Sequence, residues 1–375
     1  MTEQWSRRKF LALATGLSAA AAGACTTAPA ASPSAASPPA AGGGPTAATK
    51  PAGTVAPAPS APQARGQVKL AFIRGIFDQA YILGAQDAGI YDQHAIDLEI
   101  VPFQDDPTAT RALISGEVLV YEVAPARPLS AIDQGSALKI VGISYARLPF
   151  VMLARQGINS LRDLQGKTLG VGSPGDLNQQ LQMALLRQDG LENLDVTWAA
   201  IGPTPQIMQA LIAGRIDAGT GLFSNEIQLR GNPDIHTLAD VSQALPNLVR
   251  FALIVRQESI ERQDDILRRF FIAHSAAWRW ALEHRDEVIQ AAVKHVGMEA
   301  PIAAGAYDAA LTRPGMITPE FTVTPDQIAA VQAMNVAAGQ QTRTFSFEQV
   351  TDLRYVQAVA QTLGPYTVPV RQLTS

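Results

Sequence analysis

The sequence predicts an α/β protein with two similar lobes, each a doubly wound, mostly parallel sheet with flanking helices. The first observation is a phrase that occurs twice, as RALISGEVLVYEVAP at residues 111–125 and as QALIAGRIDAGTGLF at residues 209–223. Each copy is typical of the end of an apolar helix, a Gly stop and a short strand. The second observation is that strand-like and helix-like runs alternate around both copies, which favours parallel strands joined by right-handed crossovers. Aromatic residues are sparse, at 6% of the chain, which suits α/β packing.

The correspondence between the two copies extends upstream of the repeated phrase. Residues 96–103 (IDLEIVPF) and 196–201 (VTWAAI) are both strand-like, and each is followed by a turn and a helix without a gap between the copies. A looser match one unit earlier pairs residues 68–73 with residues 167–172. Chance similarity in a chain rich in Ala and Leu is the alternative interpretation, and the shared strand–turn–helix–strand order argues against it.

The opening of the chain has the pattern of an export signal. Arg7, Arg8 and Lys9 precede an uncharged, moderately apolar run at residues 10–24, which is of signal-peptide length and short for a membrane span. The order of residues resembles the twin-arginine export signal. Ala12 stands where that signal often has Lys, so ordinary Sec export is an alternative, as is a retained membrane anchor.

Cys25 closes this run and is the only cysteine of the chain. The residues before it resemble a bacterial lipobox, in which the Cys is lipidated after cleavage, although Ala22 replaces the usual Leu. A plain cleavage site is the alternative interpretation. Residues 26–66 are almost entirely Ala, Pro, Ser, Gly and Thr, which predicts a disordered, extended tether. The sequence therefore predicts an exported domain that is anchored to the membrane through Cys25.

Composition limits the partners of the remaining domain. Roughly 310 residues follow the tether, enough for one large domain or two lobes with cores of their own. The net charge of −4 and the pI near 5.8 leave no basic stripe, so nucleic acid is not expected as a partner.

Five segments resemble a known family of proteins. The chain is similar to solute-binding proteins of bacterial ABC importers, in the nitrate/sulfonate/taurine and thiamine-precursor (SsuA/NMT1/THI5-like) group. The most specific segment lies within residues 157–175. The resemblance is carried by GIYDQHAIDLEIVPF, RALISGEV, ALKIVGI, GINSLRDLQGKTLGVGSPG and ALIAGRIDAG.

This resemblance implies a type II periplasmic-binding-protein clamshell that closes on a small organic solute. It also implies a permease and its ATPase as partners, a monomeric state, no cofactor and no catalysis. We expect residues 67–155 and 249–375 to form lobe 1 and residues 156–248 to form lobe 2. The expected crossings between the lobes are residues 156–160 and 250–255, where closure would be hinged.

Two glycine-containing motifs are better explained as structure than as nucleotide sites. Residues 170–175 match GxGxxG after a strand, but residues 201–203, where a dinucleotide fold needs an acid, contain none. Residues 166–168 imitate the end of a Walker motif but lead into a strand. The chain's histidines show no metal-ligand spacing, and Ser173 lacks the Gly of a nucleophile elbow, so no metal is expected.

The candidate ligand site consists of the loops at the carboxyl ends of the predicted strands, where ligands bind in doubly wound sheets. The resemblance implies that the loops of both lobes face one another. Any single member could instead be a solvated loop residue. The candidates are Arg74, Phe77, Asp78, Gln104, Asp105, Tyr121, Glu122, Ser173, Gly175, Asp176, Thr204, Thr220 and Phe223.

Charge in these loops favours a neutral or cationic solute, either heteroaromatic or bearing an amine. Arg74 and Arg127 are the available cations, and Tyr121 and Phe223 are possible stacking surfaces. The opposing acids would repel a free anion if they faced the cleft: Asp78, Asp105, Asp106, Glu122 and Asp176. The alternative is that Asp105, Asp106 and Asp176 cap the helices that follow them.

Two other function classes share this fold. One is an enzyme, such as a pyrimidine-precursor synthase or a cysteine-dependent desulfinase, but those relatives use cysteines within the domain and this domain has none. The other is a sensory domain whose closed form signals to a partner.

Overall fold

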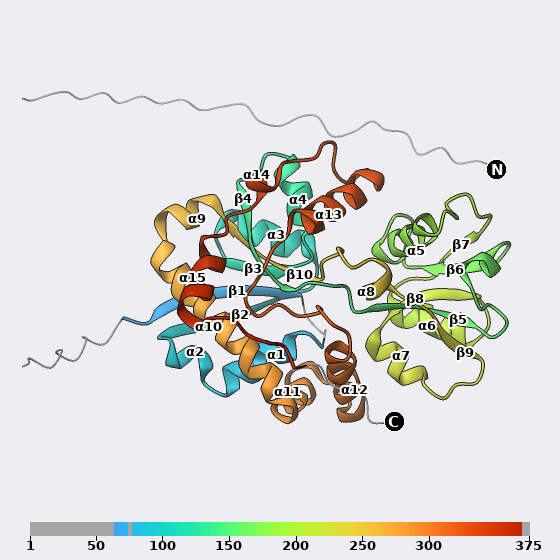
Figure 1. The fold of residues 1–375 in the computed structure, drawn as a ribbon, viewed down its shortest axis with the longest axis horizontal. Helices are drawn as coiled ribbons and strands as arrows, with labels where there is room; N and C mark the ends of the chain where they lie inside the picture. The colour runs from blue at the N-terminus through green and yellow to red at the C-terminus, as the bar shows by residue number, and fades with distance from the viewer. Residues whose placement is uncertain (1–63, 74–76, 370–375) are drawn as a thin grey trace, which may run out of the picture. The chain divides into compact units, whose positions relative to one another are not determined.

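The computed structural model describes residues 64–73 and 77–369, all within the compact unit Ser60–Ser375 (Figure 1). The predicted signal, Cys25, most of the tether and Arg74 lie outside the described residues. Within the described part, no helix is long and apolar enough to cross a membrane.

The first sheet has five strands in the order β2-β1-β3-β10-β4. β1 runs parallel to β2 and β3, and β10 runs antiparallel to both of its neighbours. This sheet collects strands from both ends of the domain: β1 (Gly66–Ile73), β2 (Ile96–Phe103), β3 (Val120–Val123), β4 (Leu138–Tyr145) and β10 (Phe251–Arg256).

The second sheet repeats this arrangement, in the order β7-β6-β8-β5-β9. Here β6 is parallel to β7 and β8, while β5 is antiparallel to β8 and β9. In each sheet the antiparallel strand is the first strand that the chain forms after crossing from the other sheet. The strands are β5 (Phe150–Arg155), β6 (Thr168–Val171), β7 (Thr197–Ala200), β8 (Ala218–Leu222) and β9 (Ile235–Asp240).

The crossings differ from those predicted. Because β5 pairs with β8 and β9, the first crossing is residues 146–149 and the first lobe ends before residue 150, not at residue 155. Residues 156–160 lie inside the second lobe. The second crossing is residues 245–250, since the predicted segment 250–255 is mostly β10 itself.

Helices cover both faces of the first sheet. On one face, Leu113, Leu129 and Ile328 share an apolar cluster with the strands. The helices of this face are α3 (Asp106–Ser115), α4 (Ala126–Asp133), α13 (Pro325–Ala337) and α14 (Phe347–Val350). On the other face lie α1 (Gln79–Asp87), α2 (Ile90–Gln93), α9 (Gln257–Arg262), α10 (Asp264–Glu283), α11 (Arg285–Ala291), η2 (Ala292–Val296), α12 (Ala300–Leu311) and α15 (Arg354–Leu363).

The second sheet is also covered on both faces. Leu181, Leu185 and Val241 belong to a cluster on one face, whereas Ile207 and Leu211 belong to a cluster on the other. The first face carries α5 (Leu177–Gln188) and α8 (Val241–Ala244), and the second carries α6 (Thr204–Ile212) and α7 (Phe223–Leu229). The short η1 (Leu161–Leu164) connects β5 to β6. The predicted two-lobed α/β fold is confirmed.

Candidate ligand-binding site

A cavity of about 180 Å³ lies where strands of both sheets end. Asp78 follows β1, Thr204 begins α6 after β7, and Phe223 begins α7 after β8. Carboxyl ends of strands are the usual place for ligands in such sheets. The cavity is lined by Phe77, Asp78, Tyr145, Pro149, Thr204, Pro205, Leu222, Phe223, Ser224, Asn225, Met298 and Ala306.

The one ionisable carboxylate of this lining is already paired. Nε of Arg250 lies 3.0 Å from Oδ2 of Asp78, and both side chains are nearly buried. Burial raises the pKa of the Asp78 carboxyl above its usual range, and the adjacent Arg250 opposes that rise. The pair places a polar but electrically balanced group in the wall of the cavity.

Aromatic rings form much of the remaining wall. Phe77 meets Tyr81 edge to face at 5.5 Å between ring centroids, and Tyr145 meets Trp278 edge to face at 6.4 Å. These supporting rings are buried and fix the orientation of the lining rings. Rigid rings that surround a small cavity suit a planar, apolar or heteroaromatic group.

Arg313 joins the two lobes beside this cavity. It follows α12, and its guanidinium pairs with Glu226 in α7 at 3.1 Å and with Asp240 at the end of β9. The same guanidinium lies 3.9 Å above the ring centroid of Phe223. We call this group the Arg313 clasp. No local sequence pattern indicates this group, because its acidic partners are 73 and 87 residues away along the chain.

Four predicted site residues line the cavity, namely Phe77, Asp78, Thr204 and Phe223. They come from both sheets, so the structure brings these loops together as expected. Whether they contact a solute stays a prediction.

Two predicted acidic residues serve as helix caps. Asp105 accepts a hydrogen bond from the backbone N–H of Thr108 at 2.8 Å and begins α3. Asp176 accepts hydrogen bonds from the backbone N–H groups of Gln179 and Gly172, at 3.0 and 2.9 Å, and begins α5. These contacts correspond to the capping alternative, and they direct two of the five carboxylates to backbone N–H groups of helix ends.

Tyr121, Glu122 and Thr220 are buried and are not available on the surface of the cleft in this structure. The hydroxyl of Tyr121 donates a hydrogen bond to Oδ1 of Asp106 at 2.7 Å, and because the side chain is fully buried it offers no free ring face for stacking. Thr220 donates to the side-chain oxygen of Asn178 at 3.0 Å. Alternation along a strand turns some side chains into the core, and loop-end position alone did not reveal which ones.

Glu122 belongs to a buried polar chain in the first lobe. Its carboxylate accepts a hydrogen bond from Ser144 and lies 3.1 Å from Nε2 of His274. Nδ1 of His274 in turn lies 2.7 Å from the hydroxyl of Tyr91. Since each member is satisfied by another, the chain is structural rather than part of the cleft.

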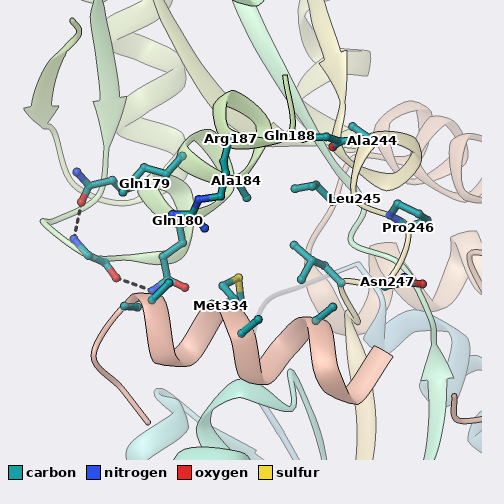
Figure 2. Close-up of a pocket in the computed structure, with 17 residues that line it drawn as sticks. Gln179, Gln180, Ala184, Arg187, Gln188, Ala244, Leu245, Pro246, Asn247 and Met334 are labelled. Carbon is teal, nitrogen blue, oxygen red and sulfur yellow. Dashed lines mark hydrogen bonds between the residues drawn. The ribbon is translucent and has the colours of Figure 1, made fainter. Parts of the chain in front are cut away.

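Two other predicted residues, Gln104 and Ser173, are exposed and line neither concavity described here. Gly175 lies at the edge of a larger pocket of about 690 Å³, between α5, α13 and residues 244–248 (Figure 2). Among the described residues, no group of three or more His, Cys, Asp or Glu could hold a metal ion.

Two sheets of matching topology, joined by two crossings and facing each other with the carboxyl ends of their strands, define a two-lobed α/β protein of the periplasmic-binding-protein fold. A family model described as "NMT1/THI5 like" matches residues 76–288, more than half of the chain. The chain belongs to the NMT1/THI5-like family.

Named relatives of this chain are binding proteins. This chain is 28% identical over 258 residues to the riboflavin-binding protein RibY of Chloroflexus aurantiacus. The aligned residues cover 65% of this chain and 71% of RibY. A putative binding protein of Brucella abortus is 26% identical over 153 residues, 40% of this chain and 46% of that protein.

Solved structures show the same fold at low sequence identity. The periplasmic aliphatic sulphonate binding protein SsuA of Escherichia coli is 19% identical with a TM-score of 0.65, covering 76% of this chain and 92% of SsuA. The desulfurization enzyme DSZB is 14% identical with a TM-score of 0.57, covering 79% of this chain and 99% of that enzyme. Binding proteins and an enzyme therefore share this fold.

Proposed function

We propose that this protein is an exported solute-binding protein that captures a small organic molecule between its two lobes and delivers it to the permease and ATPase of an ABC importer. The observation that carries the proposal is the cavity at the strand ends of both sheets, which Phe77 and Asp78 line from one lobe and Thr204 and Phe223 from the other. Membership of the NMT1/THI5-like family supports it.

The solute is proposed to be neutral and heteroaromatic. The aromatic wall supports a planar ring, and the Asp78–Arg250 pair leaves no uncompensated charge on the lining. A cationic solute has less support than a neutral one, because Asp105 and Asp176 cap helices and Glu122 is buried in its own network. Similarity to a riboflavin-binding protein makes riboflavin the first probe.

Calorimetric titration with riboflavin and with an alkanesulfonate tests the ligand class. We expect riboflavin to bind and the alkanesulfonate not to bind. Phe223→Ala should weaken riboflavin binding by about tenfold or more, since a stacked ring contributes roughly 1–3 kcal/mol. Phe347→Ala, which removes a ring outside the cavity, should leave the affinity unchanged. Equal losses in the two variants would contradict the placement of the site.

Closure around the solute has its own signature. Saturating riboflavin should lower the radius of gyration in solution scattering and raise the melting temperature. The stabilisation is expected to be about 2.7 kcal/mol at a hundredfold excess over Kd. Binding without compaction would argue against closure of the lobes.

Anchoring through Cys25 is part of the proposal and rests on the sequence alone. Cys25→Ser should move the protein from the membrane fraction to the soluble exported fraction. A wild-type protein that is already soluble would exclude the lipid anchor.

An enzymatic role is the second candidate, because the fold of DSZB is similar. The absence of any cysteine after Cys25 argues against a cysteine-dependent desulfinase. Incubation with an aromatic sulfinate, followed by assay for released sulfite, distinguishes the two functions.

A further inference from the structure

The larger pocket lies between the two lobes and shares no lining residue with the solute cavity, although Gly175, a candidate site residue of the sequence analysis, is part of its lining. Its walls are α5 of the second lobe and α13 of the first, and residues 244–248, from the end of α8 into the second crossing, complete it (Figure 2). Its volume of about 690 Å³ falls within the range of about 300–1,000 Å³ that is usual for sites that enclose a small organic molecule.

Both helices contribute apolar side chains to the pocket. Met183 and Ala184 on α5 face the pocket, as do Ala333, Met334 and Ala337 on α13. The alanines leave space that larger side chains would fill. Met183 is 43% exposed, so its apolar surface remains uncovered by the rest of the protein.

The charge of the lining has a single sign. Of the residues that line the pocket, all of them described, none is Asp or Glu, and Arg187 is the one ionisable group. Arg187 makes no side-chain hydrogen bond or ion pair within the described part of the chain, unlike Arg250 and Arg313. Figure 2 shows its side chain on the α5 wall, near Gln180.

Neutral polar groups are positioned on the same wall. The amide nitrogen of Gln180 donates to the carbonyl of Gly175 at 2.7 Å, and the side-chain oxygen of Gln179 accepts from the N–H of Gly175 at 2.6 Å (Figure 2). These two bonds hold both side chains and leave an amide N–H₂ group on Gln179 unused among the described residues. The amide of Gln179 is directed toward Gly175, so Arg187 is the group of this wall that is suited to pair with the oxygens of an acidic group.

We infer that this pocket is a second binding site, which takes a small organic anion with an apolar or aromatic body. The body would lie between Met183 and Ala333, and the anionic group would pair with Arg187. Since the walls belong to different lobes, a bound molecule would also hold α5 and α13 at one separation. The site is independent of the solute cavity, which has its own lining residues.

Titration of the folded, full-length protein with anilinonaphthalene sulfonate, an aromatic sulfonate whose fluorescence rises in apolar sites, tests this inference. We expect one saturable site. Arg187→Gln should weaken binding by about tenfold, the usual loss for one charge-assisted hydrogen bond. Arg162→Gln is the matched control, because it removes an exposed arginine of the same lobe that does not line the pocket and makes no side-chain ion pair among the described residues.

Two further variants test the walls. Ala333→Trp fills the space and should abolish binding of the probe. Met183→Glu adds a carboxylate at an exposed helix position, where folding is expected to survive, and should repel the probe. Melting curves establish that each variant is folded.

The inference is overturned if wild type shows no saturable binding, or if Arg187→Gln and Arg162→Gln have equal effects. It is also overturned if Phe223→Ala abolishes probe binding while Met183→Glu does not. Failure here leaves riboflavin binding at the solute cavity unaffected, so the two proposals fail separately.

Discussion

The two sides of the region between the lobes are built differently. On the side of α7 and α12, one apolar cluster runs without interruption from the first sheet to the second and includes both Tyr307 and Phe223. On the side of α5 and α13, the two lobes have separate buried clusters. Only the partly buried Ala330 and Met334 of α13 pack against the cluster of the second lobe, and the 690 Å³ pocket lies between α5 and α13.

Close packing reinforces the first side. A Cβ atom at Gly305 of α12 would lie 2.7 Å from Cγ2 of Ile227 in α7, so a hydrogen is all that fits there. The Arg313 clasp lies at the same junction. We therefore expect α7 and α12 to stay in contact, and changes in the separation of the lobes to occur between α5 and α13.

The largest expected effect comes from breaking the clasp. Arg313→Gln leaves Glu226 and Asp240, both mostly buried, without their cation, and should cost about 2–3 kcal/mol of unfolding free energy in urea titrations. It should also weaken riboflavin binding, because the ring of Phe223 loses its support.

The matched control is Arg285→Gln, which removes an ion pair with Asp308 between α11 and α12 of the same lobe. These side chains are more exposed, so a loss of about 1 kcal/mol and an unchanged affinity are expected. Equal effects on affinity would show that the Arg313 clasp has no special role beside the cavity.

A smaller effect on stability is expected when one residue is enlarged on each side of the region between the lobes, in α12 and in α13. Gly305→Val should destabilise the protein by about 1–3 kcal/mol, because a stiff branched side chain cannot avoid Ile227. Ala333→Val in α13 points into open space and should cost only its helix propensity, about 0.5 kcal/mol. Similar losses in chemical denaturation would remove the contrast between the two sides.

Asp78 and Asp105 are expected to contribute to the pH dependence of stability with opposite signs. The raised pKa of Asp78 means that the folded state binds its proton more tightly than the unfolded state does. Its contribution to stability should therefore fall as the pH rises from its ordinary pKa, 3.8, through the raised value, and Asp78→Asn should remove this slope.

Asp105 behaves in the opposite way, since the hydrogen bond from Thr108 lowers its pKa. Its contribution is present above the ordinary pKa and is lost as the pH falls through the lowered value. Urea titrations of both Asn variants between pH 3 and pH 7 measure the two slopes. Slopes of the same sign would contradict the assignment.

No effect on the closure of the lobes is expected from a substitution in the predicted crossing at residues 156–160. Gly157 has a φ of 90° and no neighbour that would meet a Cβ atom, so Gly157→Ala should cost about 1 kcal/mol through backbone strain alone. Because this turn lies within the second lobe, compaction on binding should be unchanged in solution scattering. A change in compaction on ligand binding would instead support the prediction that this turn is a hinge between the lobes.

Local patterns were sufficient to predict the fold. The Gly stops, the strand-like runs and the turn residues repeat in both lobes, and Gly116 and Gly214 both adopt positive φ at helix ends. The loops that hold Phe77, Thr204 and Phe223 could be placed from strand ends alone.

Features that depend on distant segments could not be predicted. The apolar run at residues 150–155 predicts a strand, but its pattern does not indicate which of the two sheets the strand joins. The first crossing was therefore predicted at residues 156–160 instead of before residue 150. Nothing near Arg313 in the sequence indicates its partners. The larger pocket depends on α13 lying near α5, and along the chain the two helices are separated by the rest of the second lobe and by β10 to α12 of the first. Whether Glu122 or Thr220 faces a ligand depends on the tilt of a strand, which its sequence does not specify.

The placement of the antiparallel strands has a consequence for the order of folding. All five strands of the second sheet come from one continuous stretch, Phe150 to Asp240, so this lobe contains everything it needs once that stretch has been synthesised. The first sheet has a gap between β3 and β4 until β10 enters it, and β10 is made only after the whole second lobe. The lobe that begins first along the chain therefore completes its sheet last, and until Phe251–Arg256 arrives it exposes two unpaired strand edges to any chaperone or translocation factor.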